Sequence, residues 1–346
     1  MAQALGVPQL DRILEPVPHG ATLLFLNDPG VEAEPFLYQV ASGALQQGRD
    51  VVYLVTNRAP ASVRKAMDEY GLATQGPGAK LAFVDAYSAL MGSWGDDAHV
   101  VMRPQDPREV ARALEAAAAR HPGAVLVVDA LSALADHSSE AFAAAAPALL
   151  AAMRRFSLTA ALFTRWGHPP EAMQALEAFD GLVTVRAVED RVVLSQYFRL
   201  ERAAWKQSID AKPRLYKSVK PGGVLVYIPK IVVTGPFNAG KSSFVHAVSD
   251  AAVSVDHLGT TVALDHGRVT MDGLTADVFG TPGQARFDPI LRIVAGQAVG
   301  VIVVVDSSKP DSFPRAREMM QLTWRQGLPG IVAATKQDLP DALAPE

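Results

Sequence analysis

The segment at residues 235–242, GPFNAGKS, has the residue types and spacing to bind nucleotide phosphates. It fits the pattern G-x-x-x-x-G-K-[ST], follows the aliphatic run KIVVT and precedes the helix-compatible stretch SFVHAVSD. In this setting the glycines let backbone N–H groups converge on phosphate oxygens, and the helix N-terminus adds its positive dipole. Lys241 would reach the β- and γ-oxygens, and Ser242 would offer its hydroxyl to Mg²⁺. We therefore predict a phosphate-binding loop that includes Gly235, Asn238, Ala239, Gly240, Lys241, Ser242 and Ser243.

A tetrapeptide after a later aliphatic run, TKQD at residues 335–338, has the chemistry to select the base. A carboxylate accepts two hydrogen bonds from guanine N1–H and N2–H₂, which adenine cannot donate, and a buried carboxylate without donors is costly. The tetrapeptide resembles the [NT]-K-x-D guanine motif of Ras-like GTPases. The resemblance predicts that Thr335, Lys336 and Asp338 recognise guanine.

Residues 259–265, GTTVALD, resemble the first switch of the same superfamily. There a threonine hydroxyl completes the Mg²⁺ shell only when the γ-phosphate is present. The resemblance assigns this role to Thr261, and the alternative is a β-branched residue at the start of a strand.

Residues 277–287, DVFGTPGQARF, resemble the second switch, D-T-A-G-Q-E-R-F. In that register Gly283 senses the γ-phosphate and Gln284 positions the attacking water. Gly280 then stands where most relatives carry the aspartate that holds Mg²⁺ through water. Asp277 lies three residues before Gly280, and an alignment that uses Asp277 as the metal aspartate moves Gln284 out of the glutamine position. We therefore prefer the alignment that keeps Gln284 in place. The metal position stays open between Asp277 and Gly280.

Taken together, these segments resemble prokaryotic Ras-like GTPases akin to the gliding-motility protein MglA, over residues 230–346. The resemblance implies GTP and GDP as ligands, Mg²⁺ as cofactor, and slow hydrolysis that depends on an activating protein and signals to an effector. It implies Gln284, Lys241 and Thr261 as the catalytic set and Ser242 and Thr261 as metal ligands. Such domains continue for roughly 40 residues beyond the guanine motif. We therefore expect either a truncated sequence or a domain without its last strand and helix.

The arginines near the second switch are candidates for a charge-stabilising finger. They are Arg286 and Arg292, and the alternative for each is a solvated position on the switch helix.

The elements that must position these residues are strands covered on both faces. Short aliphatic runs recur along the whole chain, and continuous apolarity is typical of buried parallel strands. Helical stretches at residues 61–70, 107–120 and 140–156 alternate with them, which predicts two doubly wound α/β domains. The runs lie at residues 21–26, 50–55, 80–85, 124–129, 159–164, 230–235, 274–279, 300–306 and 330–335.

The first domain, residues 1–229, resembles a RecA-like ATPase of the KaiC type in the layout of residues 20–134 and in the closing hairpins at residues 197–228. Where that family reads G-x-P-G-x-G-K-T, this chain reads NDPGVEAE from Asn27. Ala33 replaces the lysine, and Glu32 and Glu34 would repel a triphosphate.

Asn57 and Arg58 stand in the positions of that family's paired catalytic glutamates. Asp129 matches its magnesium aspartate, and the alternative is a strand-terminating cap. We interpret this half as a pseudo-ATPase retained for assembly, including homo-oligomers, or for partner docking.

Composition excludes several function classes. The chain has 346 residues and a net charge of −4, so it lacks the basic field expected of a nucleic-acid-binding protein. It contains no cysteine, which excludes disulfides and thiolate metal sites. The start does not read as a signal peptide, and no apolar run reaches the ~20 residues of a membrane span, so we expect a cytoplasmic protein.

Residues 199–230 carry a basic run in the boundary region, which is either a solvated hairpin or linker or a binding surface. Two rival functions stay open. One is a non-hydrolysing nucleotide-binding scaffold, and the other is a KaiC-like ATP-driven regulator.

Overall fold

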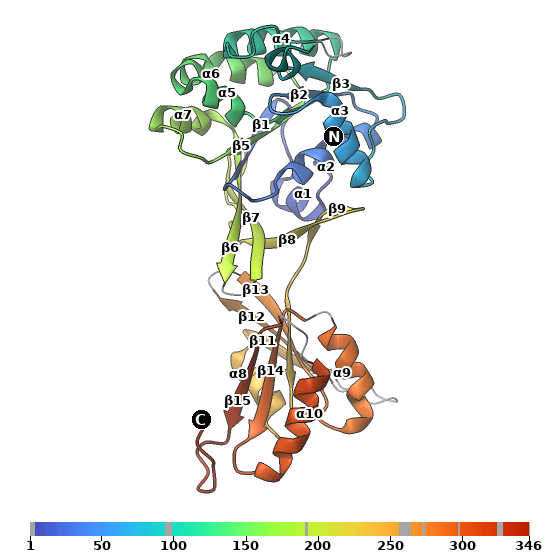
Figure 1. The fold of residues 1–346 in the computed structure, drawn as a ribbon, viewed down its shortest axis with the longest axis vertical. Coiled ribbons are helices and arrows are strands. Elements are labelled where there is room, and N and C mark those ends of the chain that lie inside the picture. Colours follow the sequence, from blue (N-terminus) through green and yellow to red (C-terminus); the bar gives the residue numbers. More distant parts are fainter. Residues whose placement is uncertain are drawn as a thin grey trace. The chain divides into compact units, whose positions relative to one another are not determined.

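A computed structural model describes residues 4–93, 99–190, 193–255, 264–271, 274–296, 298–323 and 328–345. It divides into two compact units, Met1–Glu189 with Leu194–Val226 and Asp190–Val193 with Tyr227–Glu346. Each unit has a sheet with helices on its faces, which confirms the predicted α/β class (Figure 1). The division at residues 229 and 230 into independent domains stays a proposal.

The first unit is built on a nine-stranded sheet in the order β3-β2-β4-β5-β1-β6-β7-β8-β9. The pairs from β3 to β6 are parallel, whereas β7–β8 and β8–β9 are antiparallel. The strands are β1 (Ala21–Asn27), β2 (Val51–Val55), β3 (Leu81–Asp85), β4 (Val125–Asp129), β5 (Leu158–Thr164), β6 (Gly181–Asp190), β7 (Val193–Ala203), β8 (Arg214–Val219) and β9 (Gly223–Val226).

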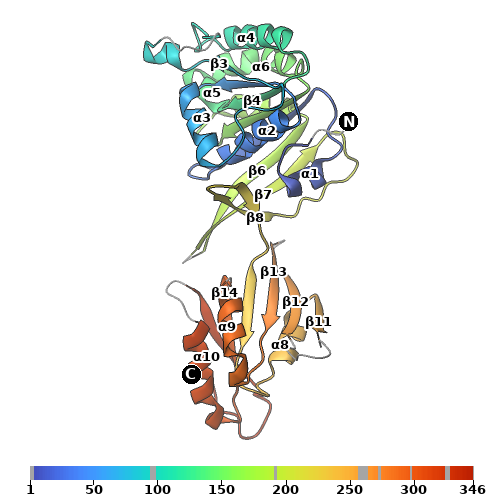
Figure 2. The ribbon, with the colours of Figure 1, turned by 90° about the vertical axis from the view of Figure 1, so that its right-hand side faces the viewer.

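Helices cover both faces of this sheet, so its strands contribute to two cores (Figure 2). In β2 the alternate residues Val51, Tyr53 and Val55 join one core, and Val52 and Leu54 join the other. This alternation explains the continuous apolar runs, because both faces must be apolar. The first core includes residues of α1 (Pro8–Leu14), α2 (Glu34–Gln46) and α3 (Pro60–Glu69), and the second includes residues of α4 (Pro107–Arg120), α5 (Ser132–His137), α6 (Ser139–Met153) and α7 (Pro170–Ala175).

The second unit has a six-stranded sheet in the order β11-β12-β13-β10-β14-β15. The pairs β13–β10, β10–β14 and β14–β15 are parallel, and β11–β12 and β12–β13 are antiparallel. Its strands are β10 (Lys230–Thr234), β11 (Ala251–Val255), β12 (Leu264–Met271), β13 (Leu274–Gly280), β14 (Gly300–Asp306) and β15 (Gly330–Thr335).

Helix α8 (Lys241–Val248) covers one face of the second sheet, where Val245 packs with Val233 and Val278. Helices α9 (Asp288–Ala295) and α10 (Phe313–Thr323) cover the other, where Leu291 and Met319 pack with the strands. The short 3₁₀ helices of the chain are η1 (Ser88–Met91), η2 (Leu176–Ala178), η3 (Ala285–Phe287) and η4 (Pro310–Ser312). Within the described residues, no helix has the length and apolarity needed to cross a membrane.

The basic run at residues 199–230 contributes to β7, β8 and β9 of the first sheet. Several of its cations have acidic partners within the first unit. Arg199 pairs with Glu201 at 2.7 Å, and Lys220 with Glu69 at 2.8 Å. These contacts favour the hairpin interpretation over a binding surface.

Candidate functional site

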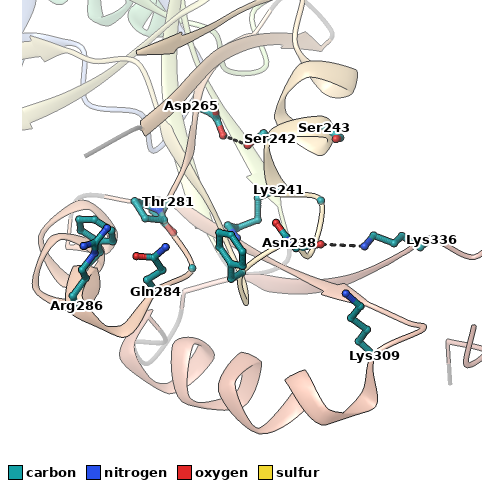
Figure 3. A pocket seen from close by; sticks show the side chains of 15 residues that line it. Asn238, Lys241, Ser242, Ser243, Asp265, Thr281, Gln284, Arg286, Lys309 and Lys336 are labelled. Carbon is teal, nitrogen blue, oxygen red and sulfur yellow. Dashed lines mark hydrogen bonds between the residues drawn. The ribbon is translucent and has the colours of Figure 1, made fainter. Parts of the chain in front are cut away.

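A cleft of about 650 Å³ opens in the second unit, where the strands β10, β13, β14 and β15 end (Figure 3). In α/β sheets the carboxyl ends of parallel strands are the usual place for a ligand. The cleft is lined by Phe237, Asn238, Gly240, Lys241, Ser242, Ser243, Asp265, Thr281, Pro282, Gly283, Gln284, Arg286, Phe287, Lys309 and Lys336.

The loop between β10 and α8 has a backbone that glycine makes possible. Gly235 has φ +148°, and a Cβ at this position would lie 2.1 Å from the carbonyl oxygen of Val304. Gly240, which caps α8, has φ +89°, in the left-handed region. The loop therefore turns tightly over the sheet and delivers Lys241 as the first residue of the helix.

Lys241 is buried, and its Nζ donates to the carbonyl oxygen of Pro236 at 2.7 Å. Burial lowers the pKa of its ammonium to about 8, and the carboxylate of Asp265 acts in the opposite direction. An anion in the cleft would stabilise the charged form of this lysine. The side chain thus lines the cleft and turns back over the loop that precedes it, and its contact with phosphate stays a prediction.

Ser242 and Asp265 bring two oxygen ligands together at the start of α8. The Ser242 hydroxyl donates to Asp265 Oδ2 at 2.6 Å, and both residues line the cleft (Figure 3). A hydroxyl and a carboxylate fit Mg²⁺, which takes one or two protein ligands together with phosphate oxygens and water. Thr261, the other predicted metal ligand, lies outside the described residues.

The segment after β13 comes close to the phosphate loop. A Cβ on Gly283 would lie 2.5 Å from the backbone nitrogen of Phe237, so this approach requires glycine. Thr281 is buried and donates to the Thr234 hydroxyl at 3.0 Å. The next residue after Gly283 is Gln284, whose exposed side chain lines the cleft together with Lys241 (Figure 3).

Asp277 occupies a different part of β13. Its carboxylate pairs with Arg268 at 2.9 Å and with His266 at 3.4 Å. It is not among the residues that line the cleft, whereas Gln284 is. This arrangement favours the register in which Gly280 stands at the metal position.

The guanine motif follows β15, and its first two residues contact the phosphate loop. Thr335 Oγ1 donates to the carbonyl oxygen of Ala239 at 2.7 Å. Lys336 Nζ donates to the carbonyl oxygen of Asn238 at 3.1 Å and to Asp306 Oδ2 at 2.5 Å. Its hydrogen bond is the main reason that the pKa of Asp306 falls to about 2.

Of the predicted nucleotide-binding residues, four do not line the cleft. Gly235 and Ala239 shape the loop, and Thr335 holds it through the hydrogen bond to Ala239. Asp338 is exposed in the turn after β15, outside the cleft lining. Its role in base recognition stays a prediction.

Sequence reasoning missed several residues of the cleft. In the sequence Asp265 is only the last residue of the first-switch segment, and its hydrogen bond with Ser242 of the phosphate loop depends on strand register. Arg286 lines the cleft with its guanidinium 4.7 Å from the Phe287 ring centroid, whereas Arg292 is exposed on α9 and does not line it. Besides Asp265, the lining residues that the sequence does not predict are Phe237, Thr281, Pro282, Phe287 and Lys309.

The corresponding loop of the first unit, between β1 and α2, is occupied by the chain's own side chains. Glu34 Oε2 accepts the N–H of Ala33 at 3.2 Å, and Arg58 Nη2 donates to Glu34 Oε1 at 3.0 Å. Arg58 also donates to the Tyr38 hydroxyl at 3.0 Å, and its Nε lies 3.4 Å from Asp129 Oδ2. The arginine at a predicted catalytic-glutamate position therefore neutralises two carboxylates.

Asp129 is buried at the end of β4, where the Tyr53 hydroxyl donates to its carboxylate at 3.4 Å. Burial raises the pKa of Asp129 to about 6, although the Arg58 charge acts to lower it. Glu32 is exposed, and its carbonyl oxygen accepts the Tyr216 hydroxyl at 2.7 Å.

Two family models match different parts of the chain. The model described as "Family of unknown function (DUF7125)" matches residues 2–187. The model described as "Ras family" matches residues 230–343. The second match confirms the predicted Ras-like domain at the C-terminal end.

Relatives of known sequence align with about a third of the chain. An uncharacterised protein, MJ1339 of Methanocaldococcus jannaschii, is 30% identical over 112 residues, which are 32% of this chain and 72% of that protein. The ADP-ribosylation factor-like protein 8b of Arabidopsis thaliana is 28% identical over 121 residues, 34% of this chain and 65% of that protein. The aligned part therefore spans less than two thirds of the Arabidopsis protein.

Among solved structures, the KaiC-like protein PH0186 of Pyrococcus horikoshii OT3 superimposes with a TM-score of 0.51. The match covers 66% of this chain and 99% of that one, at 18% sequence identity. At this identity the likeness shows the fold alone. It confirms the predicted KaiC-type, RecA-like architecture.

Proposed function

We propose, from the premise that this chain belongs to the family of unknown function DUF7125 and carries a Ras-family domain, that it is a GTP-binding molecular switch. Its second unit would bind GTP with Mg²⁺ and hydrolyse it slowly to GDP and phosphate. Its first unit would serve assembly or partner docking without ATP chemistry.

One observation carries the nucleotide-binding part of this proposal. Lys241 is buried at the start of α8, directly after a glycine-shaped loop, and lines a cleft at the carboxyl ends of parallel strands. A buried ammonium with a lowered pKa is suited to an anionic ligand, because the ligand stabilises its charge. A triphosphate supplies such an anion, and the loop supports it with the N-terminus of α8.

The residues that would act on the phosphates have distinct tasks. Lys241 would contact the β- and γ-oxygens, and Gln284 would orient the attacking water. Ser242 and, from the first-switch resemblance, Thr261 would hold Mg²⁺, which neutralises charge on the phosphates when bound. Asp338 would accept the guanine protons and so exclude adenine.

Slow intrinsic turnover follows from the arginines near the second switch. Arg286 lies over the ring of Phe287, and Arg292 is exposed on α9. We therefore assign no arginine finger to this chain. An activating protein that supplies or redirects an arginine would accelerate hydrolysis by several orders of magnitude.

The first unit is proposed to bind no ATP because its phosphate-loop position already holds an internal ion network. Glu34 takes a backbone amide at the start of α2, and Arg58 is engaged with Glu34 and Asp129. A triphosphate would have to displace Glu34 without gaining a loop lysine, since Ala33 stands in that position. RecA-like architecture and closing hairpins persist, and we propose that they support self-association or partner docking.

The first test is the identity of the nucleotide released when the purified chain is denatured. GDP or GTP is expected, and release of adenine nucleotides alone would contradict the proposal. For the first unit, the full chain with Lys241→Ala should give no calorimetric heat with Mg-ATP. Micromolar ATP binding by that variant would favour the KaiC-like ATP-driven regulator.

A non-hydrolysing scaffold is the second candidate function, favoured by the glycine at position 280, where most relatives carry the metal aspartate. A single-turnover assay with GTP separates the two. Conversion to GDP at a measurable rate supports the switch, and bound GTP that persists for days supports the scaffold.

A further inference from the structure

The end of β13 lacks the carboxylate that a magnesium site of this class would use, because Gly280 has no side chain. Asp265 of β12 lies directly opposite Gly280 in the antiparallel pair. A Cβ on Gly280 would lie 3.0 Å from Asp265 Cβ and 3.1 Å from Asp265 Oδ2. The Asp265 side chain therefore fills the space beside position 280.

This side chain reaches the phosphate loop. Asp265 Oδ2 accepts the hydroxyl hydrogen of Ser242 at 2.6 Å, and Figure 3 shows the two side chains facing each other. The Asp265 charge also acts on the ammonium of Lys241. A carboxylate, a hydroxyl and an ammonium thus gather where α8 begins.

Asp277, the acidic residue that precedes Gly280 on β13, cannot take this role without a large movement. Asp277 pairs across the sheet with Lys230, whereas Gly280 pairs with Val233. Three residues along a strand correspond to about 10 Å. Asp277 is also engaged with Arg268 at 2.9 Å.

We propose that Asp265 supplies the carboxylate of the magnesium site, in place of the aspartate missing at position 280. The inference rests on the proposed function, since the ion would arrive with GTP or GDP. Ser242 and Asp265 together would hold it, and both offer the oxygen ligands that Mg²⁺ prefers. Metal binding then depends on the register between β12 and β13, which sets Asp265 opposite Gly280.

The test measures the release of fluorescent GDP from the full chain as free Mg²⁺ is varied. Asp265→Asn keeps the size of the side chain and removes its charge. The Mg²⁺ concentration at half-maximal retention of GDP should rise about tenfold or more. In EDTA the same variant should hold GDP at least as tightly as the parent, because one negative charge near the phosphates is gone.

Asp277→Asn is the matched control, and its Mg²⁺ midpoint should equal that of the parent. A second variant, Asp265→Gly with Gly280→Asp, moves the carboxylate back to β13 and should recover most of the Mg²⁺ response. This exchange also relieves the close approach at position 280.

Three outcomes would overturn the inference. The first is that Asp265→Asn leaves the Mg²⁺ concentration at half-maximal GDP retention unchanged. The second is that Asp277→Asn shifts this Mg²⁺ concentration as much as Asp265→Asn does. The third is that Asp265→Asn releases GDP faster than the parent in EDTA, which would indicate a structural role for Asp265. If the parent binds no guanine nucleotide, the proposed function fails as well. If the parent binds GDP and the Asp265→Asn variant needs the same Mg²⁺ concentration to retain it, only the assignment of Asp265 is contradicted.

Discussion

The two units place a strand, a loop and a helix at the same point of an α/β sheet, and they differ in what occupies the loop. After β10 the loop borders a cleft of about 650 Å³, and the cation of Lys241 belongs to the loop–helix junction itself. After β1 the equivalent position holds a carboxylate, Glu34, which accepts an amide of the loop and pairs with Arg58.

Under the proposed function, the difference explains how a loop at the phosphate-binding position can lack a nucleotide while the fold is retained. In the second unit the ammonium is buried against a carbonyl oxygen, and its pKa is lowered, so its charge is poorly compensated. In the first unit Arg58 lies between Glu34 and Asp129, and the pKa of the guanidinium is raised by those charges despite burial. The cation beside the loop after β10 would therefore be stabilised by an anionic ligand, whereas the loop after β1 already has the carboxylate of Glu34 beside it.

The largest effect is expected from removing the cation of the second loop. Lys241→Ala should reduce the affinity for GDP and GTP by at least about a hundredfold, because under the proposed function the ammonium would contact the phosphate oxygens. Titration with a fluorescent guanine nucleotide measures this loss. The first unit should stay folded, since it has cores of its own.

Lys80→Ala is the control for Lys241→Ala, because it removes the same charge from an exposed position of the first unit. It should leave GDP affinity at the parent value. Parent-like affinity in Lys241→Ala would contradict the assignment of the phosphate loop.

A smaller effect should follow from changing Asp338, the carboxylate proposed to recognise the base. Asp338→Asn loses one acceptor for the guanine protons, so the preference for GDP over xanthosine diphosphate should fall by about 10- to 100-fold, as expected for hydrogen bonds to a charged group. Competition binding with the two nucleotides measures the ratio. An unchanged preference would count against this motif as the guanine reader.

The phosphate loop could be predicted from sequence because its chemistry lies in eight consecutive residues, and the strand and helix on either side have clear patterns. The strands of the parallel sheets could be predicted for a similar reason. Burial on both faces, as in β2, makes each run apolar throughout. Local pattern and local structure agree in these segments.

Asp265 and Arg58 could not be placed from sequence, because their roles come from contacts with residues distant in the chain. The position of Asp265 beside the phosphate loop depends on the β12–β13 register, and β12 itself has a mixed polar pattern. Arg58 was recognised as a replaced catalytic position. Its contacts with Glu34 and Asp129 require the packing of α2, β2 and β4.

A moderate loss of stability should result from removing the cation of the first loop. Arg58→Ala leaves Glu34 and the buried Asp129 without their shared partner, so the free energy of unfolding should fall by about 1–3 kcal/mol, less than for a fully buried pair because Arg58 is partly exposed. Urea unfolding measures the change. Arg112→Ala, at an exposed position of α4, should change it by less than about 0.5 kcal/mol.

The last effect appears only as a difference between two pH values, and it concerns the pH dependence that Asp129 gives to the first unit. Burial raises its pKa in the fold to about 6 from the ordinary value of 3.8. Between these values the folded chain holds a proton that the unfolded chain has released, so this group's contribution to stability falls as pH rises from 4 to 6. Asp129→Asn cannot titrate and keeps the shape of the side chain. Between pH 4 and 7 the variant should therefore gain about 1–3 kcal/mol of unfolding free energy relative to the parent. Urea unfolding at both pH values gives the difference, and parallel pH profiles for the two proteins would show that Asp129 titrates alike in the folded and unfolded chain.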